Sequence, residues 1–214
     1  MIVTVTPNPV VDRTLTVPRI VMDDMVRATG VREDWGGKGF NVSRALQSFG
    51  QESVAMGFLG GAAGAKLASG LRAHGIQLTA VPIAEETRTN IVITETDAKR
   101  YVKVNEAGPT ISSEEQMVFF EYVDNLVQAG DIWALCGSLA PGLSHDFYAQ
   151  LTERLHRAGA RVLLDTSGEA FRMGISMCPD IIKPMMLRPQ RSWGRRSQAQ
   201  SRRQGLWISL WNWG

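Results

Sequence analysis

The chain has 214 residues, of which 44% are hydrophobic and 21% are charged, the composition of a globular protein with enough length for a full core. It contains no apolar run long enough to span a membrane, and its N-terminus alternates like a strand without a basic leading segment, so we expect a cytoplasmic protein with no signal peptide and no membrane partner. The net charge of +2 is uneven: residues 185–214 hold six arginines and no acidic residue, and residues 1–184 carry 17 basic against 21 acidic residues, a net −4.

The chain begins with three predicted strands. Residues 1–6 alternate between apolar and polar types, which predicts a strand, and the prolines at 7 and 9 end it. Residues 15–21 and 25–31 are predicted as two further short strands. Asp12 is expected in the connection between the first strand and the second.

A glycine-rich turn and a helix follow. The sequence Gly36-Gly37-Lys38-Gly39 lets the backbone turn sharply and lets a ligand come close to it. After Asn41, four apolar residues fall at helical spacing and Gly50 ends the run; they are Val42, Ala45, Leu46 and Phe49. The free N–H groups at the start of such a helix suit a polar or anionic ligand, although the same sequence also fits an ordinary tight turn.

Strands and helices alternate over residues 53–183, which predicts an α/β fold with a mostly parallel sheet. The predicted strands are 53–59, 76–81, 131–136, 160–165 and 180–183, and the predicted helices are 62–74, 112–129, 144–158 and 168–173. Ligands bind outside the carboxyl ends of the strands in such sheets. Here those ends carry Gly60-Gly61, Gly137-Ser138, Asp165-Thr166 and Lys183.

Two stretches do not fit this rhythm. Residues 89–96 and 100–104 alternate around a short turn, as a hairpin does. We interpret residues 15–31 and 89–104 as a small separate sheet that covers the site as a lid. Such a sheet cannot bury its outward apolar residues alone, which predicts a homodimer formed through the lids; the residues are Val17, Ile20, Val92 and Val102.

Eight motifs occur in an order that is typical of one family. They are Thr6-Pro7-Asn8-Pro9 with Asp12, Gly36 to Leu46, Gly57 to Gly61, Thr87-Arg88-Thr89-Asn90, Asn105 with Gly108-Pro109, Gly137 to Gly142, Asp165 to Gly168, and Ile182-Lys183-Pro184. Together they make residues 1–184 resemble the PfkB (ribokinase-like) carbohydrate kinases, in particular the group of 1-phosphofructokinases and tagatose-6-phosphate kinases. The resemblance implies a ribokinase-like three-layer α/β fold with a mostly parallel sheet and a small β-sheet lid.

The resemblance also implies a sugar site. Asp12 would accept hydrogen bonds from sugar hydroxyls, Gly36 and Gly37 would let the backbone approach the sugar, and Asn41 would hydrogen-bond to it. As a single residue, Asp12 also fits a cap of the turn after Pro9.

Three cations are expected near phosphates. By the resemblance, Lys38 and Arg88 would face the phosphate that the sugar already carries, because a guanidinium can hold phosphate oxygens in a two-pronged contact. Lys183 would lie on the nucleotide side, with ATP and Mg²⁺ as the cofactors. Taken singly, Lys38 and Arg88 also fit solvated surface charges, and Lys183 fits a lysine at the end of a strand.

Three further polar residues complete the expected sugar site. By the same resemblance, Asn90 and Asn105 would lie on the lid strands above the sugar, and Ser138 would lie at the carboxyl edge of the sheet. Considered one by one, they also fit ordinary turn or edge positions.

The resemblance stops after Pro184. The family takes its base and its anion hole from a GAGD motif in its C-terminal third, and an Asn and a Glu just after the Lys-Pro dipeptide order Mg²⁺; neither feature occurs here. We interpret residues 185–214 as an atypical tail rich in Arg and Trp, explained by a frame change in the coding sequence. The alternative is a genuine basic tail that binds nucleic acid or membrane, which no folded nucleic-acid motif supports.

We therefore predict an ATP-dependent kinase of a ketohexose that is already phosphorylated: fructose 1-phosphate, fructose 6-phosphate or tagatose 6-phosphate. We expect this chain to be impaired, because the C-terminal third with GAGD is missing, and we assign no catalytic or metal-binding residue to it. The alternatives are a non-catalytic remnant that binds sugar phosphate and an adaptor with a basic tail.

Overall fold

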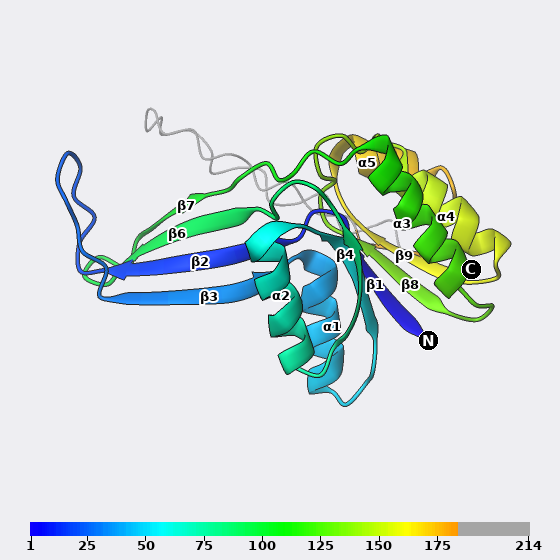
Figure 1. The fold of residues 1–214 in the computed structure, drawn as a ribbon, viewed down its shortest axis with the longest axis horizontal. Helices are drawn as coiled ribbons and strands as arrows, with labels where there is room; N and C mark the ends of the chain where they lie inside the picture. The colour runs from blue at the N-terminus through cyan, green and yellow to red at the C-terminus, as the bar shows by residue number, and fades with distance from the viewer. Residues whose placement is uncertain (184–214) are drawn as a thin grey trace, which may run out of the picture.

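The computed structural model describes residues 1–183, so the predicted tail over 185–214 lies outside the described residues. The described part consists of a layered α/β body and a second, smaller sheet that extends from one side of it (Figure 1). This arrangement confirms the predicted fold class, with its mostly parallel sheet and its separate lid sheet. No helix within residues 1–183 has both the length and the apolar character needed to cross a bilayer.

The body is built on six parallel strands in the order β10-β9-β8-β1-β4-β5. Their bounds are Ile2–Thr6 (β1), Val54–Leu59 (β4), Gln77–Pro82 (β5), Ile132–Cys136 (β8), Arg161–Asp165 (β9) and Ile181–Ile182 (β10). Helices cover both faces of the sheet, so all six residues of β4 are buried, and the central strand β1 buries Thr4 and Thr6 as well as its valines. Since the strands are parallel, their carboxyl ends meet at one edge.

Helices cover the two faces of this sheet (Figure 1). Lys38–Ser48 (α1) and Gly61–Ala73 (α2) lie on one face, and Ser113–Leu126 (α3), Phe147–Arg157 (α4) and Gly168–Ile175 (α5) lie on the other. The second face encloses an aromatic cluster in which the ring centroids of Phe58, Phe119 and Phe147 lie 4.6–6.3 Å apart. Each face therefore has its own hydrophobic core.

Helix α1 starts earlier than predicted and buries a different face. It begins at Lys38, directly after Gly37, and the predicted inward residue Phe49 is 85% exposed. The side toward the sheet carries Phe40 together with the small residues Gly39 and Ser43, because α1 packs very close to β1. A Cβ atom at Gly39 would lie 2.6 Å from the Val5 carbonyl oxygen, and the Ser43 hydroxyl lies 2.7 Å from that of Thr4.

The lid sheet has the strand order β3-β2-β6-β7. Its strands are Val10–Val17 (β2), Gly30–Gly36 (β3), Thr89–Glu95 (β6) and Tyr101–Val104 (β7). The pair β6–β7 is antiparallel and confirms the predicted hairpin, and the pair β2–β6 is parallel. In Figure 1 this sheet projects away from the layered body beside α2.

The predicted bounds of the first two lid strands are wrong. Pairing between β2 and β3 runs from Val10 opposite Gly36 to Thr16 opposite Gly30, so most of the stretch 15–31 is the connection between these strands. Pro18 ends β2 because it has no N–H to donate. The expected outward position of Val17 is also wrong, since its side chain is buried, whereas Val102 is exposed as predicted.

Candidate functional site

The Gly36–Gly37 turn joins lid strand β3 to helix α1 at the centre of the candidate site. Gly37 has a φ of 127°, which only glycine adopts without strain. A Cβ atom at Gly36 would lie 2.6 Å from the Oδ2 atom of Asp12. Both glycines lie close to other parts of the chain, Gly36 to Asp12 and Val10 and Gly37 to Thr6. The approach of a sugar to this backbone stays a prediction.

Asp12 and Asn90 form a hydrogen-bonded pair on neighbouring lid strands. They are register partners in the β2–β6 ladder, and Asn90 Nδ2 donates to Asp12 Oδ1 over 2.9 Å. Asn90 is buried, and its Oδ1 accepts from the Glu106 backbone N–H at 3.3 Å. The Lys103 ammonium lies 3.7 Å from the same Asp12 oxygen. Asp12 is thus part of a strand, so both the expectation that it lies in a connection and the alternative of a turn cap are wrong.

Arg88 lies next to this pair and is engaged by the backbone. Its guanidinium donates to the carbonyl oxygens of Asn8 at 3.0 Å, Pro9 at 3.4 Å and Glu106 at 3.0 Å. Burial lowers the pKa of Arg88, while the carboxylates of Asp12 and Glu106 act in the opposite direction. The side chain therefore ties the turn after β1 to the segment after β7, a structural role that the sequence did not suggest.

A second group of charges lies at the carboxyl edge of the body sheet. Asp165 ends β9, and its two carboxylate oxygens each bind a lysine: Lys38 Nζ lies 3.2 Å from Oδ1, and Lys183 Nζ lies 2.9 Å from Oδ2. The Asp165 side chain is only 10% exposed, whereas that of Lys183 is 67% exposed. From the sequence, Lys38 was expected at the sugar phosphate and Lys183 at the nucleotide. Within the described residues, the Asp165 carboxylate binds both lysines.

The end of strand β8 supports this charged group. The Gly137 carbonyl accepts hydrogen bonds from the Tyr148 hydroxyl at 3.0 Å and from the Thr166 hydroxyl at 2.7 Å. Burial raises the pKa of the Cys136 thiol to about 12, with a smaller contribution from Asp165 in the same direction. Cys136 is therefore a protonated, structural residue at neutral pH and not a nucleophile.

Three predicted site residues are exposed and lie outside both groups. The Asn41 Oδ1 atom accepts a hydrogen bond from Arg44 Nη1 at 3.4 Å, on the exposed side of α1. The side chains of Asn105 and Ser138 are exposed and have no hydrogen-bond partner within residues 1–183. Ser138 does follow the end of β8 at the carboxyl edge, as expected, and Asn105 follows β7.

The structure thus brings the predicted residues together in two groups. The lid group contains Asp12, Asn90 and Arg88 around the turn, and the edge group contains Lys38 and Lys183. Lys38 directly follows Gly37, so the glycine turn connects the two groups along the chain. Sequence reasoning missed the partners that hold these residues, Asp165, Lys103 and Glu106. The one available signal was the position of Asp165 at the end of a buried strand.

The described residues fit the phosphates of a nucleotide better than a metal ion. Two lysines at the carboxyl edge can face phosphate oxygens. Residues 1–183 contain no group of three His, Cys, Asp or Glu side chains that could hold a metal. Asp165 is already neutralised by two ammonium groups, so it does not fit the role of a Mg²⁺ ligand in this arrangement.

Comparison with known proteins gives concordant matches. A model of the pfkB family of carbohydrate kinases matches residues 6–187. Over 184 residues the chain is 37% identical to the 1-phosphofructokinase of Bacillus subtilis (strain 168), an alignment that covers 86% of this chain and 59% of the relative. The chain therefore spans about three fifths of the length of this relative.

Solved structures agree with this match. The tetrameric inhibited form of phosphofructokinase-2 from Escherichia coli superposes with a TM-score of 0.80 at 28% identity, over 86% of this chain and 60% of that one. The same enzyme in complex with fructose-6-phosphate gives a TM-score of 0.78, over 82% of this chain and 58% of that one. Ribokinase from Arabidopsis thaliana, solved with ribose and ATP, shares the fold, with a TM-score of 0.61 at 21% identity over 86% of this chain and 59% of that one.

Proposed function

Because the chain belongs to the pfkB family of carbohydrate kinases, we propose that it is the sugar-binding part of an ATP-dependent kinase of phosphorylated ketohexoses. The reaction moves the γ-phosphoryl group of ATP to a free hydroxyl of fructose 1-phosphate, fructose 6-phosphate or tagatose 6-phosphate. The observation that carries the proposal is the Asp12–Asn90 pair beside the Gly36–Gly37 turn. We place the protein in the cytoplasm, where such substrates occur.

The Asp12 carboxylate has the geometry for a sugar contact. Asn90 and Lys103 lie near its Oδ1 atom, and the Oδ2 atom lies above Gly36, where a Cβ atom would block it. A carboxylate oxygen accepts hydrogen bonds from hydroxyl groups. Because the Asn90 amide already holds the Asp12 side chain in place, little conformational entropy is lost when a sugar binds. In this proposal Asp12 and Asn90 hold the sugar hydroxyls, together with the backbone of the turn and the neighbouring Asn41, Asn105 and Ser138.

Phosphate recognition is assigned to the cations around the turn. Arg88 uses N–H groups on three carbonyls, but a guanidinium has five, so donors remain for the phosphate of the sugar. Lys38 faces the same phosphate from the start of α1, where the N-terminal end of the helix also favours an anion. Lys183 is assigned to the phosphates of ATP, across Asp165 from Lys38.

Phosphoryl transfer needs more than these residues supply. ATP with Mg²⁺ supplies the activated phosphoryl group, and the family's GAGD segment supplies the base and the anion hole. The 214 residues contain no GAGD segment, which favours a second candidate function for this polypeptide by itself: a domain that binds sugar phosphate without turning it over.

A homodimer through the lids accompanies this proposal. Strand β7 forms one edge of the lid sheet, and its residues Tyr101, Val102 and Val104 are exposed. An open edge with apolar side chains favours pairing with a second copy. Light scattering at micromolar concentration would show twice the mass of the chain, and a monomer would contradict this part of the proposal.

Equilibrium binding tests the proposed substrate class. In isothermal titration of the 214-residue chain, we expect at least one ketohexose phosphate to bind at least about tenfold more tightly than fructose, because the phosphate adds charge-assisted contacts. Arg88→Gln and Lys38→Gln should narrow this difference. Equal affinity for fructose and for its phosphates would contradict the assigned phosphate contacts.

A further inference from the structure

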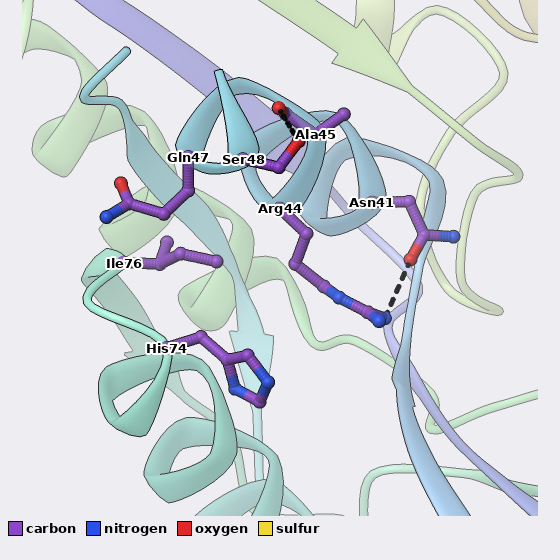
Figure 2. A pocket seen from close by; sticks show the side chains of 7 residues that line it. All are labelled: Asn41, Arg44, Ala45, Gln47, Ser48, His74 and Ile76. Atoms are coloured by element: carbon purple, nitrogen blue, oxygen red, sulfur yellow. Dashed lines mark hydrogen bonds between the residues drawn. The ribbon is translucent and has the colours of Figure 1, made fainter. Parts of the chain in front are cut away.

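A cavity of about 560 Å³ lies on the exposed side of α1, between this helix and the turn from α2 into β5. Figure 2 shows the side chains that line it: Asn41, Arg44, Ala45, Gln47 and Ser48 from α1, and His74 and Ile76 from the turn. Its volume falls within the range of about 300–1,000 Å³ that is usual for small-molecule sites. Of these residues, only Asn41 has a role in the function proposed above.

Arg44 gives the cavity a permanent positive charge, and none of the lining residues is acidic. Its Nη1 atom donates to the Trp35 carbonyl oxygen at 3.2 Å and to Asn41 Oδ1 at 3.4 Å, which fixes the guanidinium beside the cavity (Figure 2). Its Nε and Nη2 groups make no hydrogen bond within residues 1–183. A fork of N–H donors therefore remains for an oxyanion.

His74 lines the cavity from the other element. Its Nδ1 atom lies 2.8 Å from the Gly70 carbonyl oxygen, and because a carbonyl can only accept, Nδ1 must carry the proton. In the neutral ring Nε2 is then an acceptor, which a carboxylate cannot satisfy but a P–OH group can. Phosphate esters have a second pKa of about 6, so they keep a proton for part of the time near neutral pH. The Arg44 donors and the His74 acceptor together match phosphate better than carboxylate.

We propose that this cavity binds a small phosphate-bearing metabolite, with the phosphate between Arg44 and His74. The organic part lies over Ile76, which is 3% exposed, and over Ala45. The Gln47 side-chain amide lies close to the Gly75 turn, since a Cβ atom at Gly75 would be 3.1 Å from Gln47 Nε2. From this end of the cavity the Gln47 amide can hydrogen-bond to the ligand. Arg44 and His74 have no part in the proposed kinase reaction, whereas Asn41 lines this cavity, accepts from Arg44 and also belongs to the proposed sugar site.

Inorganic phosphate is the probe that tests the site in the 214-residue chain. The chain has three histidines, so the imidazole C–H signals of His74 can be followed by NMR beside those of His145 and His156. At constant ionic strength, with chloride as the compensating anion, we expect phosphate to shift the His74 signals saturably and to leave the other two unchanged. Succinate, the carboxylate probe, should give a much weaker shift.

Two variants and one control sharpen this test. Arg44→Gln should weaken phosphate binding at least about tenfold, because a charged donor fork is lost. Arg72→Gln, two residues before His74 and outside the lining, removes the same charge and should leave the affinity unchanged. His74→Asn keeps an N–H for the Gly70 carbonyl and should reduce the ³¹P line broadening that the chain causes.

The outcomes that would overturn the proposal are distinct from a failure of the kinase proposal. A His74 shift that is absent or does not saturate, or an equal response to succinate, would exclude a phosphate site. Equal affinities in Arg44→Gln and Arg72→Gln would show a general charge effect. Since the probe is not a sugar and the readout is local to His74, a chain that fails to bind ketohexose phosphates can still pass this test.

Discussion

The body strands are buried between two layers of helices, whereas the lid strands are partly open to solvent along most of their length. All six residues of β4 are buried, and all four residues of β7 are exposed. A strand that is covered on both faces is mostly apolar, and its polar side chains, such as Thr4 and Thr6 in β1, are hydrogen-bonded, because an unpaired polar group there is costly. A partly open strand can carry a carboxylate such as Asp12 in mid-strand at little cost. The body therefore supplies stability, and the lid can carry the polar groups that the proposed sugar site uses.

The two regions nevertheless meet at one turn. Gly36 is the last residue of lid strand β3, and Lys38 is the first residue of α1 on the body. The lid group at Asp12 and the edge group at Asp165 are thus joined by two glycines. A ligand that contacts both groups would hold the lid against the body, which is a physical reason for placing the acceptor sugar here.

The largest expected effect concerns turnover, which neither region can supply alone. We expect the 214-residue chain to phosphorylate each ketohexose phosphate at least about 10⁴-fold more slowly than a chimera that continues from Lys183 with the C-terminal part of the Bacillus subtilis relative. A base and an anion hole each contribute typically about two orders of magnitude or more. The rate of ADP release in the presence of ATP, Mg²⁺ and each sugar phosphate gives the turnover of both proteins.

The chimera provides its own control. Asp12→Ala in the chimera should lower turnover through weaker sugar binding while the added segment stays intact. Equal rates for the 214-residue chain and the chimera would show that the base lies within this chain, and the assignment of roles from the family would then be wrong.

The next effect compares the stability that the two regions provide. Phe147→Ala removes a ring from the centre of the aromatic cluster and should lower the free energy of unfolding by about 3–5 kcal/mol. In the monomer at low protein concentration, Val102→Ala on an exposed lid strand should change it by less than about 0.5 kcal/mol. Urea unfolding followed by circular dichroism measures both variants. At micromolar concentration the proposed lid-to-lid dimer covers Val102, so the loss in Val102→Ala should be larger there, and an equally small loss at both concentrations would contradict the dimer.

The sequence predicted the buried body strands better than lid strands β2 and β3 for the same physical reason, while the lid hairpin β6–β7 was predicted as well as the body strands. Buried parallel strands have strong apolar runs, and residues 131–136 and 160–165 were placed to within one residue of β8 and β9. The predicted helix over 112–129 starts at a capping box: Ser112 Oγ accepts from the Glu115 backbone N–H, and the Glu115 carboxylate accepts from the Ser112 backbone N–H. Local hydrogen bonds of this kind depend only on nearby residues.

Lid strands β2 and β3 and the inner face of α1 were harder to predict because their patterns depend on tertiary contacts. In β2 the polar residues from Asp12 to Thr14 hide the strand, since their pairing partners on β3 and β6 lie far along the chain. In α1 the closeness to β1 selects Gly39 and Ser43 for the inner side, so hydrophobicity gives the wrong face. Motif order predicted that Asp12, Arg88 and Asn90 lie near one another, and the structure brings these three together. It gave no sign that Arg88 binds three carbonyls or that one aspartate holds two lysines.

The smallest expected effect tests the lid residue that carries the proposed function. Asp12→Ala should weaken ketohexose phosphate binding by about 1–3 kcal/mol, because sugar hydroxyls and Asn90 lose their acceptor. Asp34→Ala is the matched control: Asp34 is the register partner of Asp12 on β3, and its carboxylate pairs with Arg32 instead of Asn90. It removes the same charge from the same row of the lid and should change the affinity by less than about 0.5 kcal/mol, as surface substitutions usually do. Titration calorimetry at two salt concentrations separates a direct contact from a field effect, since exposed charges are screened by salt. Equal losses in both variants, falling together as salt rises, would mean that Asp12 acts only through its charge and does not contact the sugar.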